Sequence, residues 1–243
     1  MMARAVLLTR PEPGLSETRA RLEALGWPVV EAPALVIAPV SLRLAARPAA
    51  ILLASRSALP ALDDLPRDIP LFAVGAGSAA AAEARGFTTV EAAEGDAAHL
   101  VPLVAARLSP QGGPLLLPVG EGYGKELAAA LRAHDFRVWR RVAYRVRPSA
   151  DLPPAARQAI STGQVAAALF YSPRSAACAM KLWRAAGLAD AAREVEALAL
   201  SPRIATTLAG LPWRRVRTAE RPDQDLLIDL LGPGPGGKTA GAA

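Results

Sequence analysis

The strongest constraint on the fold is a regular alternation of short apolar runs with Ala/Leu/Arg-rich stretches. The run AVLL at 5–8 predicts a strand, and PVVEAP at 28–33 predicts the next one. Between them, Ser16 is a candidate N-cap, residues 18–25 form the predicted helix, and Gly26 is its C-cap. Strands that alternate with helices of this length imply a parallel sheet covered by helices on both faces. The sequence therefore predicts an α/β fold.

The same order of elements occurs twice along the chain. The matched stretches are 6–33 with 115–144, 51–62 with 168–180, and 71–100 with 197–227. Ser55 and Ser172 head equivalent turns and lie about one domain length apart in the sequence. We therefore expect two similar, doubly wound, flavodoxin-like α/β domains. Pro39 and the Pro-rich stretch 147–154 are the best internal linker candidates, and the Gly/Pro/Ala-rich tail 232–243 is expected to be disordered.

The composition excludes several classes of site. Cys178 is the only cysteine, so no intrachain disulfide can form, and His99 and His134 are the only histidines. We expect no metal site, because these residues have no ligand spacing. No apolar run reaches the roughly 18–20 residues that cross a bilayer, and the N-terminus lacks a signal-peptide pattern. The chain is therefore expected to be cytoplasmic, with no membrane partner.

A formal net charge of +6 favours an anionic partner. The densest basic cluster, RVWRRV at 137–142, suits an exposed strand edge equally well, and no run of five Lys or Arg occurs. Aromatic residues make up only 5% of the chain, which is low for a nucleic-acid-binding surface. We therefore expect a small polyanion as ligand and no nucleic acid.

The candidate binding residues lie in turns that follow a predicted strand and precede a predicted helix. They are Arg10; Ser55, Arg56 and Ser57; Gly75 and Ser78; Gly120 and Lys125; Ser172, Arg174 and Ser175; and Ser201 and Arg203. In a parallel sheet such turns meet at the carboxyl ends of the strands, where ligands bind. Hydroxyls, Arg or Lys side chains and free helix-terminal amides suit carboxylates or phosphates. If the two domains face each other, both sets of turns line one cationic cleft.

Two further features have their own interpretation. GAGSAA at 75–80 matches a dinucleotide-binding pattern, which leaves a dinucleotide-dependent enzyme as one alternative. Tyr144 ends a predicted strand at the candidate domain junction, and a phenol carries its proton at neutral pH, so Tyr144 is the candidate proton donor. A non-enzymatic two-domain protein that closes on a polyanionic small molecule is the other alternative.

The motifs together resemble the uroporphyrinogen-III synthase family. The matching pieces are VLLTRPE, ASRSAL, AVGAGSA followed by EARGF, LLLPVGEGYGKEL, VAYRV, FYSPRSA, ALSPRIA and AERPDQDLL, in this order between residues 6 and 231. The resemblance implies two α/β domains joined by a two-stranded β-ladder. One domain would comprise 1–36 and 149–231, and the other 40–141. The segments 34–39 and 142–148 would be the linker strands.

The resemblance also implies the reaction. Linear hydroxymethylbilane, with eight carboxylates, would lose its terminal hydroxyl as water to give an azafulvene. Ring D would attack through its substituted carbon to give a spiro intermediate, which fragments and recloses with ring D inverted. No cofactor is needed, and the main task is to hold the chain so that the less accessible carbon attacks. The partners implied are this substrate and a transient contact with the enzyme that supplies it, for a chain expected to be a monomer.

Some residues match the family's positions and others depart from them. Tyr144 matches the tyrosine proposed as the family's proton donor, Ser55 and Ser172 match paired hydroxyl positions, and Lys125 replaces a basic residue that opens a helix. The late turn reads Ser201-Pro202-Arg203-Ile204 where the family usually has Gly-x-Thr-Thr, so Arg203 is expected to contact a carboxylate directly. Ala54 stands where the family often has Thr.

Overall fold

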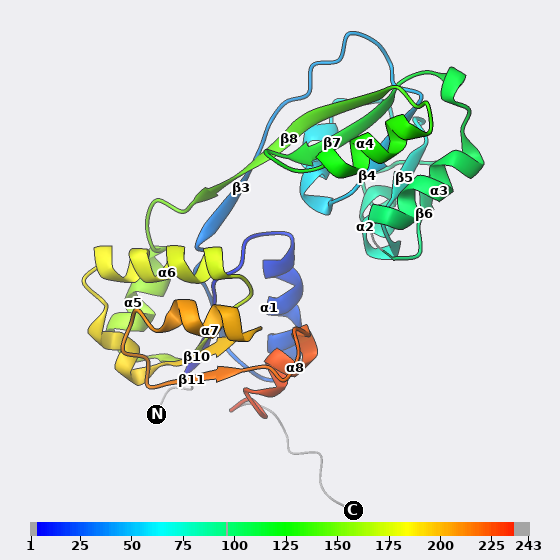
Figure 1. The fold of residues 1–243 in the computed structure, drawn as a ribbon. Helices are drawn as coiled ribbons and strands as arrows, with labels where there is room; N and C mark the ends of the chain where they lie inside the picture. Colours follow the sequence, from blue (N-terminus) through cyan, green and yellow to red (C-terminus); the bar gives the residue numbers. More distant parts are fainter. Residues whose placement is uncertain (1–3, 96, 236–243) are drawn as a thin grey trace, which may run out of the picture. The chain divides into compact units, whose positions relative to one another are not determined.

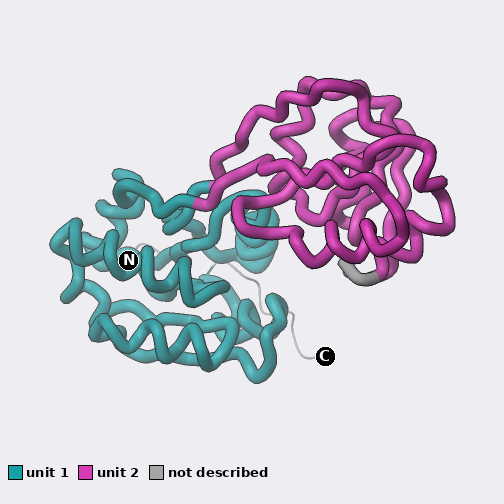
Figure 2. Tube along the Cα trace, turned by 45° about the horizontal axis from the view of Figure 1, so that its top comes forward, with its two compact units in different colours: residues 1–36, 147–243 teal, residues 37–146 magenta. Residues whose placement is uncertain are grey.

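The chain folds into two compact units. The computed structural model describes residues 4–95 and 97–235. Unit 1 comprises Met1–Val36 and Arg147–Ala243, and unit 2 comprises Ile37–Val146 (Figure 2). Within the described part of the chain, no helix combines the length and apolar character needed to cross a membrane.

Unit 1 is built on a five-stranded sheet in the order β11-β10-β9-β1-β2 (Figure 1). Its strands are β1 (Ala5–Leu8), β2 (Val29–Glu31), β9 (Val165–Phe170), β10 (Glu196–Ala199) and β11 (Arg215–Thr218). Its helices are α1 (Gly14–Ala24), α5 (Pro154–Ser161), α6 (Pro173–Ala185), the 3₁₀ helix η3 (Asp190–Glu194), α7 (Pro202–Leu208) and α8 (Gln224–Asp229). Its neighbouring strands are parallel, and the order is the flavodoxin-like one.

Alternate residues of the unit 1 strands pack on opposite faces of the sheet, as the period of two requires. Leu7 joins a core formed with α5, α6 and α7, which includes the fully buried Trp183. Val6 and Leu8 join a second core on the other face, with Leu22 of α1 and apolar residues of α8. Burial on both faces explains why β1 reads as a continuous apolar run.

Unit 2 holds the strands of a six-stranded sheet in the order β3-β8-β7-β4-β5-β6. The strands are β3 (Leu35–Pro39), β4 (Ala50–Leu53), β5 (Leu71–Ala73), β6 (Val90–Ala92), β7 (Leu115–Gly120) and β8 (Val138–Pro148). The helices are η1 (Arg56–Leu62), α2 (Ala76–Glu83), α3 (Ala97–Arg107), η2 (Pro110–Gly112) and α4 (Lys125–Ala133). Apolar residues of α3 and α4 pack on one face, and those of η1 and α2 pack on the other.

The two sheets repeat one arrangement with a different chain order. Strands β2-β1-β9-β10-β11 of unit 1 correspond in position to β8-β7-β4-β5-β6 of unit 2. In unit 1 the chain forms the pair β1–β2 first and the strands β9, β10 and β11 later. In unit 2 it forms β4, β5 and β6 first and the pair β7–β8 last. The unit boundaries fall within β3 and β8, which are neighbours in one sheet. The predicted fold class, two doubly wound α/β domains, is confirmed.

Local boundaries differ from the predicted ones at two places. Helix α1 begins at Gly14, four residues before the predicted start, because the carboxylate of Glu12 accepts a hydrogen bond from the backbone N–H of Ser16 and takes the capping role assigned to that serine. The predicted tail begins at Gly232, but its carbonyl accepts a hydrogen bond from the indole of Trp27 (3.1 Å). Residues 236–243 of that tail lie outside the described residues.

Candidate functional site

Each sheet has one point where the direction of its connections reverses. In unit 1 this switch point lies between β1 and β9, and in unit 2 it lies between β7 and β4. In open α/β sheets, ligands bind outside the carboxyl ends of the strands at such a point, because the two loops there leave the sheet in opposite directions. The two switch points are therefore the first places to look for a site.

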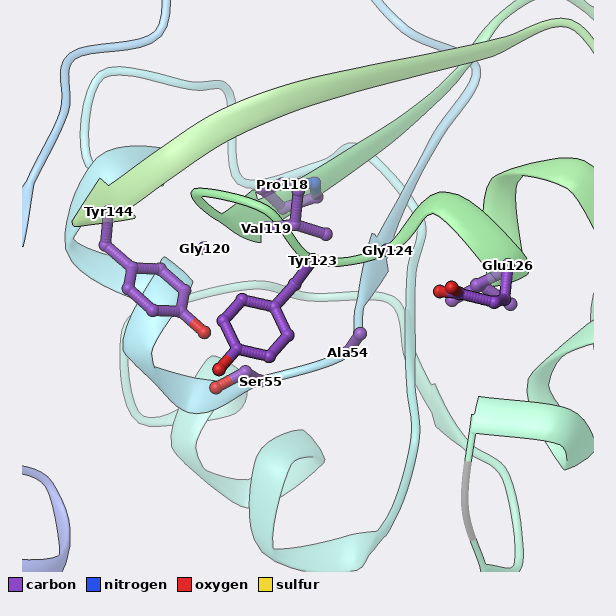
Figure 3. A pocket seen from close by; sticks show the side chains of 10 residues that line it. Ala54, Ser55, Pro118, Val119, Gly120, Tyr123, Gly124, Glu126 and Tyr144 are labelled. Atoms are coloured by element: carbon purple, nitrogen blue, oxygen red, sulfur yellow. The ribbon is translucent and has the colours of Figure 1, made fainter. Parts of the chain in front are cut away.

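The switch point of unit 2 is hollow. A cavity of about 310 Å³ opens there, between the end of β4, the turn after β7 and the ring of Tyr144 (Figure 3). Its lining residues are Ala54, Ser55, Pro118, Val119, Gly120, Tyr123, Gly124, Glu126, Leu127 and Tyr144. Of the residues predicted for binding or catalysis, Ser55, Gly120 and Tyr144 thus come together around one pocket.

Tyr144 is held against the end of β7. A register shift after Val119 brings Gly120 opposite Tyr144, and the N–H of Glu121 donates to the Tyr144 carbonyl (3.1 Å). A Cβ at position 120 would lie 2.8 Å from two carbons of the Tyr144 ring and 3.0 Å from its oxygen. Gly120 therefore provides the space that the ring occupies, and Tyr144 is only 9% exposed. The sequence predicts that Gly120 contributes a free amide to ligand binding. The structure adds a second role, which is to leave room for the Tyr144 ring.

Tyr123 is a pocket residue that the sequence analysis missed. It lies between Gly122 (φ 88°) and Gly124 (φ 77°), in a turn whose left-handed positions favour glycine. Its N–H donates to the Gly120 carbonyl (3.0 Å), and its carbonyl accepts from Arg140 (2.9 Å), yet the residue is 63% exposed. In Figure 3 the hydroxyls of Tyr123 and Tyr144 both point towards Ser55. An aromatic residue between two glycines after a strand was the signal in the sequence.

Ser55 combines a local structural role with its place at the pocket. It is the N-cap of η1, and its hydroxyl accepts a long hydrogen bond from the N–H of Ser57 (3.3 Å). Arg56 and Ser57 follow in the first turn, and both are half-buried. The Ser55 side chain thus lies where β4 ends, with its oxygen beside the two phenols (Figure 3).

At the switch point of unit 1, side chains of the unit contact one another across the ends of β1 and β9. The guanidinium of Arg10 lies over the ring of Tyr171, 4.2 Å from its centroid. The same guanidinium donates to the Thr18 hydroxyl (3.0 Å) and to Gln224 (2.8 Å), which joins α1 to α8. Burial raises the pKa of the Tyr171 phenol above its ordinary value, and the nearby Arg10 charge acts in the opposite direction. Arg10, predicted to bind substrate, is therefore engaged within unit 1.

The remaining predicted residues of unit 1 lie at two helix N-termini. The Ser172 hydroxyl caps α6 by accepting a hydrogen bond from the N–H of Ser175 (3.1 Å). In return, the Ser175 hydroxyl donates to the Ser172 carbonyl (3.0 Å), and Ser175 as a whole is only 2% exposed. Arg174 is exposed on the first turn of α6. Ser201 precedes α7, with Arg203 exposed in its first turn. Any contribution of Ser175 to binding would act through the helix end that it supports.

The remaining predicted residues of unit 2 do not line the pocket. Gly75 precedes α2 in an extended conformation, and its carbonyl accepts from the N–H of Ser78 (3.0 Å). This turn follows β5, one strand away from the switch point, which does not favour the dinucleotide interpretation of GAGSAA. Lys125 is exposed at the start of α4.

A model of one protein family matches most of the chain. The model, described as uroporphyrinogen-III synthase HemD, matches residues 16–229. The chain belongs to the uroporphyrinogen-III synthase family. It is therefore an enzyme of haem biosynthesis, a cyclising lyase that acts on a small molecule, and the predicted family and activity are confirmed over the two alternatives.

Two solved structures of this family match nearly the whole chain, and the first of them shows the same fold. The uroporphyrinogen-III synthetase of Helicobacter pylori 26695 is 14% identical, with a TM-score of 0.57, over 94% of this chain and 98% of that chain. A mutant uroporphyrinogen III synthase of Thermus thermophilus is 21% identical, with a TM-score of 0.44, over 95% and 97% of the two chains. No curated protein matches the chain.

Proposed function

We propose that the chain converts linear hydroxymethylbilane into uroporphyrinogen III, with inversion of ring D, and that the pocket of unit 2 is where the reacting end of the substrate binds. The observation that carries this proposal is the convergence of Ser55, Gly120 and Tyr144 on a cavity at the switch point. A cavity of about 310 Å³ is near the lower end of the roughly 300–1,000 Å³ of small-molecule sites, so it suits one part of a four-ring substrate.

Tyr144 would assist the loss of water. The substrate's terminal hydroxyl leaves more readily when a proton reaches its oxygen, and the phenol of Tyr144 would donate that proton. The electron pair of the breaking C–O bond leaves with the water, and the ring nitrogen supplies the electrons that form the new C=C bond. The pyrrole N–H proton is then lost to give the neutral azafulvene, and it would restore the phenol of Tyr144. The steric fit of Tyr144 against Gly120 supports this role, because it fixes the ring at one position in the pocket wall.

The carboxylates of the substrate would bind to the helix N-termini and basic side chains at the carboxyl edges of the sheets. In unit 2 the candidates are Arg56, Ser57, Gly75, Ser78 and Lys125. In unit 1 they are Arg10, Ser172, Arg174, Ser175, Ser201 and Arg203. Helix N-termini favour anions through their free N–H groups, and Arg pairs with carboxylates through two parallel hydrogen bonds. We further propose a cytoplasmic monomer that contacts the enzyme supplying its substrate only transiently.

The product isomer tests the function directly. Hydroxymethylbilane, supplied continuously in a coupled assay, is expected to give uroporphyrinogen III with the protein and the spontaneous isomer I without it. The same isomer composition in both reactions would refute the proposal.

The Tyr144→Phe variant tests the acid role. It keeps the ring in place and removes the hydroxyl, so we expect kcat to fall by about 100-fold, with KM nearly unchanged. A kcat equal to that of the unsubstituted protein would remove Tyr144 from the chemical step while leaving the function in place.

A further inference from the structure

The pocket of unit 2 is unsuited to a carboxylate. Among its lining residues, all within the described part of the chain, none is Lys or Arg, and Glu126 carries a negative charge. Its walls are largely apolar and include Ala54, Val119 and Leu127 together with two phenol rings. A carboxylate buried here would lose its hydration without gaining a partner charge. The flat face of an aromatic ring would bury apolar surface and gain ring contacts instead, provided that its charged substituents stay outside the pocket.

The side chain of Tyr123 has the properties of an aromatic contact surface. Its backbone is fixed by hydrogen bonds at both its N–H and its carbonyl. The residue nevertheless remains 63% exposed, the highest value among the exposed large apolar residues of the described part of the chain. A tyrosine has few rotatable bonds, so little side-chain freedom is lost when it packs on a ligand. The turn therefore presents a ring that gains contacts only when something enters the pocket.

We propose that the pocket receives one pyrrole ring of the substrate and that Tyr123 is the positioning residue that stacks on it. This inference rests on the proposed function, since a pyrrole is the flat aromatic unit of that substrate. Electron-rich rings pair with a phenol in offset or edge-to-face arrangements, which restrict the tilt of the bound ring. Restricting one ring next to the Tyr144 hydroxyl limits which carbon of the neighbouring chain can attack.

Tyr123 and Tyr144 would act through different groups, the ring of Tyr123 and the hydroxyl of Tyr144, and substitutions can separate the two. The Tyr144 hydroxyl belongs to the chemical step, so Tyr144→Phe lowers kcat. The Tyr123 contribution lies in its ring, so Tyr123→Phe keeps it and Tyr123→Ser removes it. Leu25, at the end of α1 in unit 1, is 47% exposed and serves as the matched control, because Leu25→Ser removes an exposed apolar side chain that does not line the pocket.

The experiment measures KM, kcat and the product isomers for these variants. Isomers are measured in a single turnover with enzyme in excess, so that free hydroxymethylbilane does not contribute isomer I. For Tyr123→Ser we expect about a tenfold increase in KM. We also expect uroporphyrinogen I to appear in its product. Tyr123→Phe, which keeps the ring, is expected to raise KM much less than Tyr123→Ser does. Leu25→Ser is expected to behave as the unsubstituted protein does.

Two results would overturn the proposal. One is a Tyr123→Ser variant with unchanged KM and unchanged isomer composition. The other is a Tyr123→Phe variant as impaired as Tyr123→Ser, because the hydroxyl would then act and not the ring. Both presuppose that the unsubstituted protein forms uroporphyrinogen III. If the unsubstituted protein does not form uroporphyrinogen III, the proposed function fails. If it does and the Tyr123 variants give either result above, only the role of Tyr123 fails.

Discussion

Substituting Gly120 by alanine tests whether the fit between β7 and Tyr144 matters for the reaction. The backbone at position 120 is not in the left-handed region, so alanine meets no conformational penalty there. The three atoms nearest to the added Cβ all belong to the Tyr144 ring, at 2.8, 2.8 and 3.0 Å. The substitution is therefore expected to displace Tyr144 first.

The expected effect follows from these distances. A contact of 2.8 Å must widen by about 0.6 Å to reach the 3.4 Å of an ordinary van der Waals contact. Because a misplacement of about 1 Å can cost roughly 10²-fold in rate, we expect kcat to fall by about tenfold or more. Overpacking a buried site costs about 1–3 kcal/mol, so the melting temperature should fall by a few degrees.

The assay measures kcat in the coupled reaction and the melting temperature by circular dichroism. Gly112→Ala is the matched control, because a Cβ at that exposed position meets nothing within 4 Å. Its activity and stability should stay within experimental error of the unsubstituted protein. A double-mutant cycle completes the design: in a Tyr144→Ala background the clash is absent, so Gly120→Ala should have no further effect on kcat.

Two outcomes would refute this reasoning. Full activity of Gly120→Ala would show that the position of the Tyr144 ring does not limit the reaction. An equal loss in the Tyr144→Ala background would show that Gly120 acts through some other group, such as its own amide.

Two further predictions concern the residues of unit 1 and their counterparts. Ser172→Ala should destabilise the protein by about 1–2 kcal/mol, because the buried N–H of Ser175 loses its cap. The capping hydrogen bond of Ser55 is longer, so Ser55→Ala should lower the free energy of unfolding by only about 0.5 kcal/mol or less, while it lowers activity. Chemical denaturation measures both variants, and equal stability losses for Ser55→Ala and Ser172→Ala would contradict this prediction. Arg10→Met removes the charge that lowers the pKa of Tyr171, so that pKa should rise further. Ionisation of Tyr171 should then move to higher pH in a spectrophotometric titration, and a shift to lower pH would contradict this.

The sequence supports the architecture because the signals for it are local and repeated. Ser55 and Ser172 were matched as equivalent turns, and both are N-caps in extended conformations, with φ of −159° and −153°. Apolar runs on both faces of a parallel sheet, followed by a capping serine, leave few alternative folds. The start of α1 was misplaced, because the carboxylate of Glu12 caps from outside the usual N-cap position.

The candidate site was less accessible to sequence reasoning. Tyr144, Gly120 and Ser55 were chosen separately, and only the strand order β8-β7-β4 brings them to one pocket. Arg10 was chosen for its charge, but the sequence carries no sign that Tyr171 would lie beneath it. The local signal for Tyr123, an aromatic residue between two glycines, indicates an exposed ring in a turn, but the cavity beside that ring is a property of packing and cannot be inferred from the turn.

A crystal structure of the protein with bound uroporphyrinogen III tests the central claim most directly. We predict density for one pyrrole ring in the pocket of unit 2, in contact with the Tyr123 ring and within reach of the Tyr144 hydroxyl. A well-ordered product bound elsewhere, with that pocket empty and Tyr123 still exposed, would contradict it.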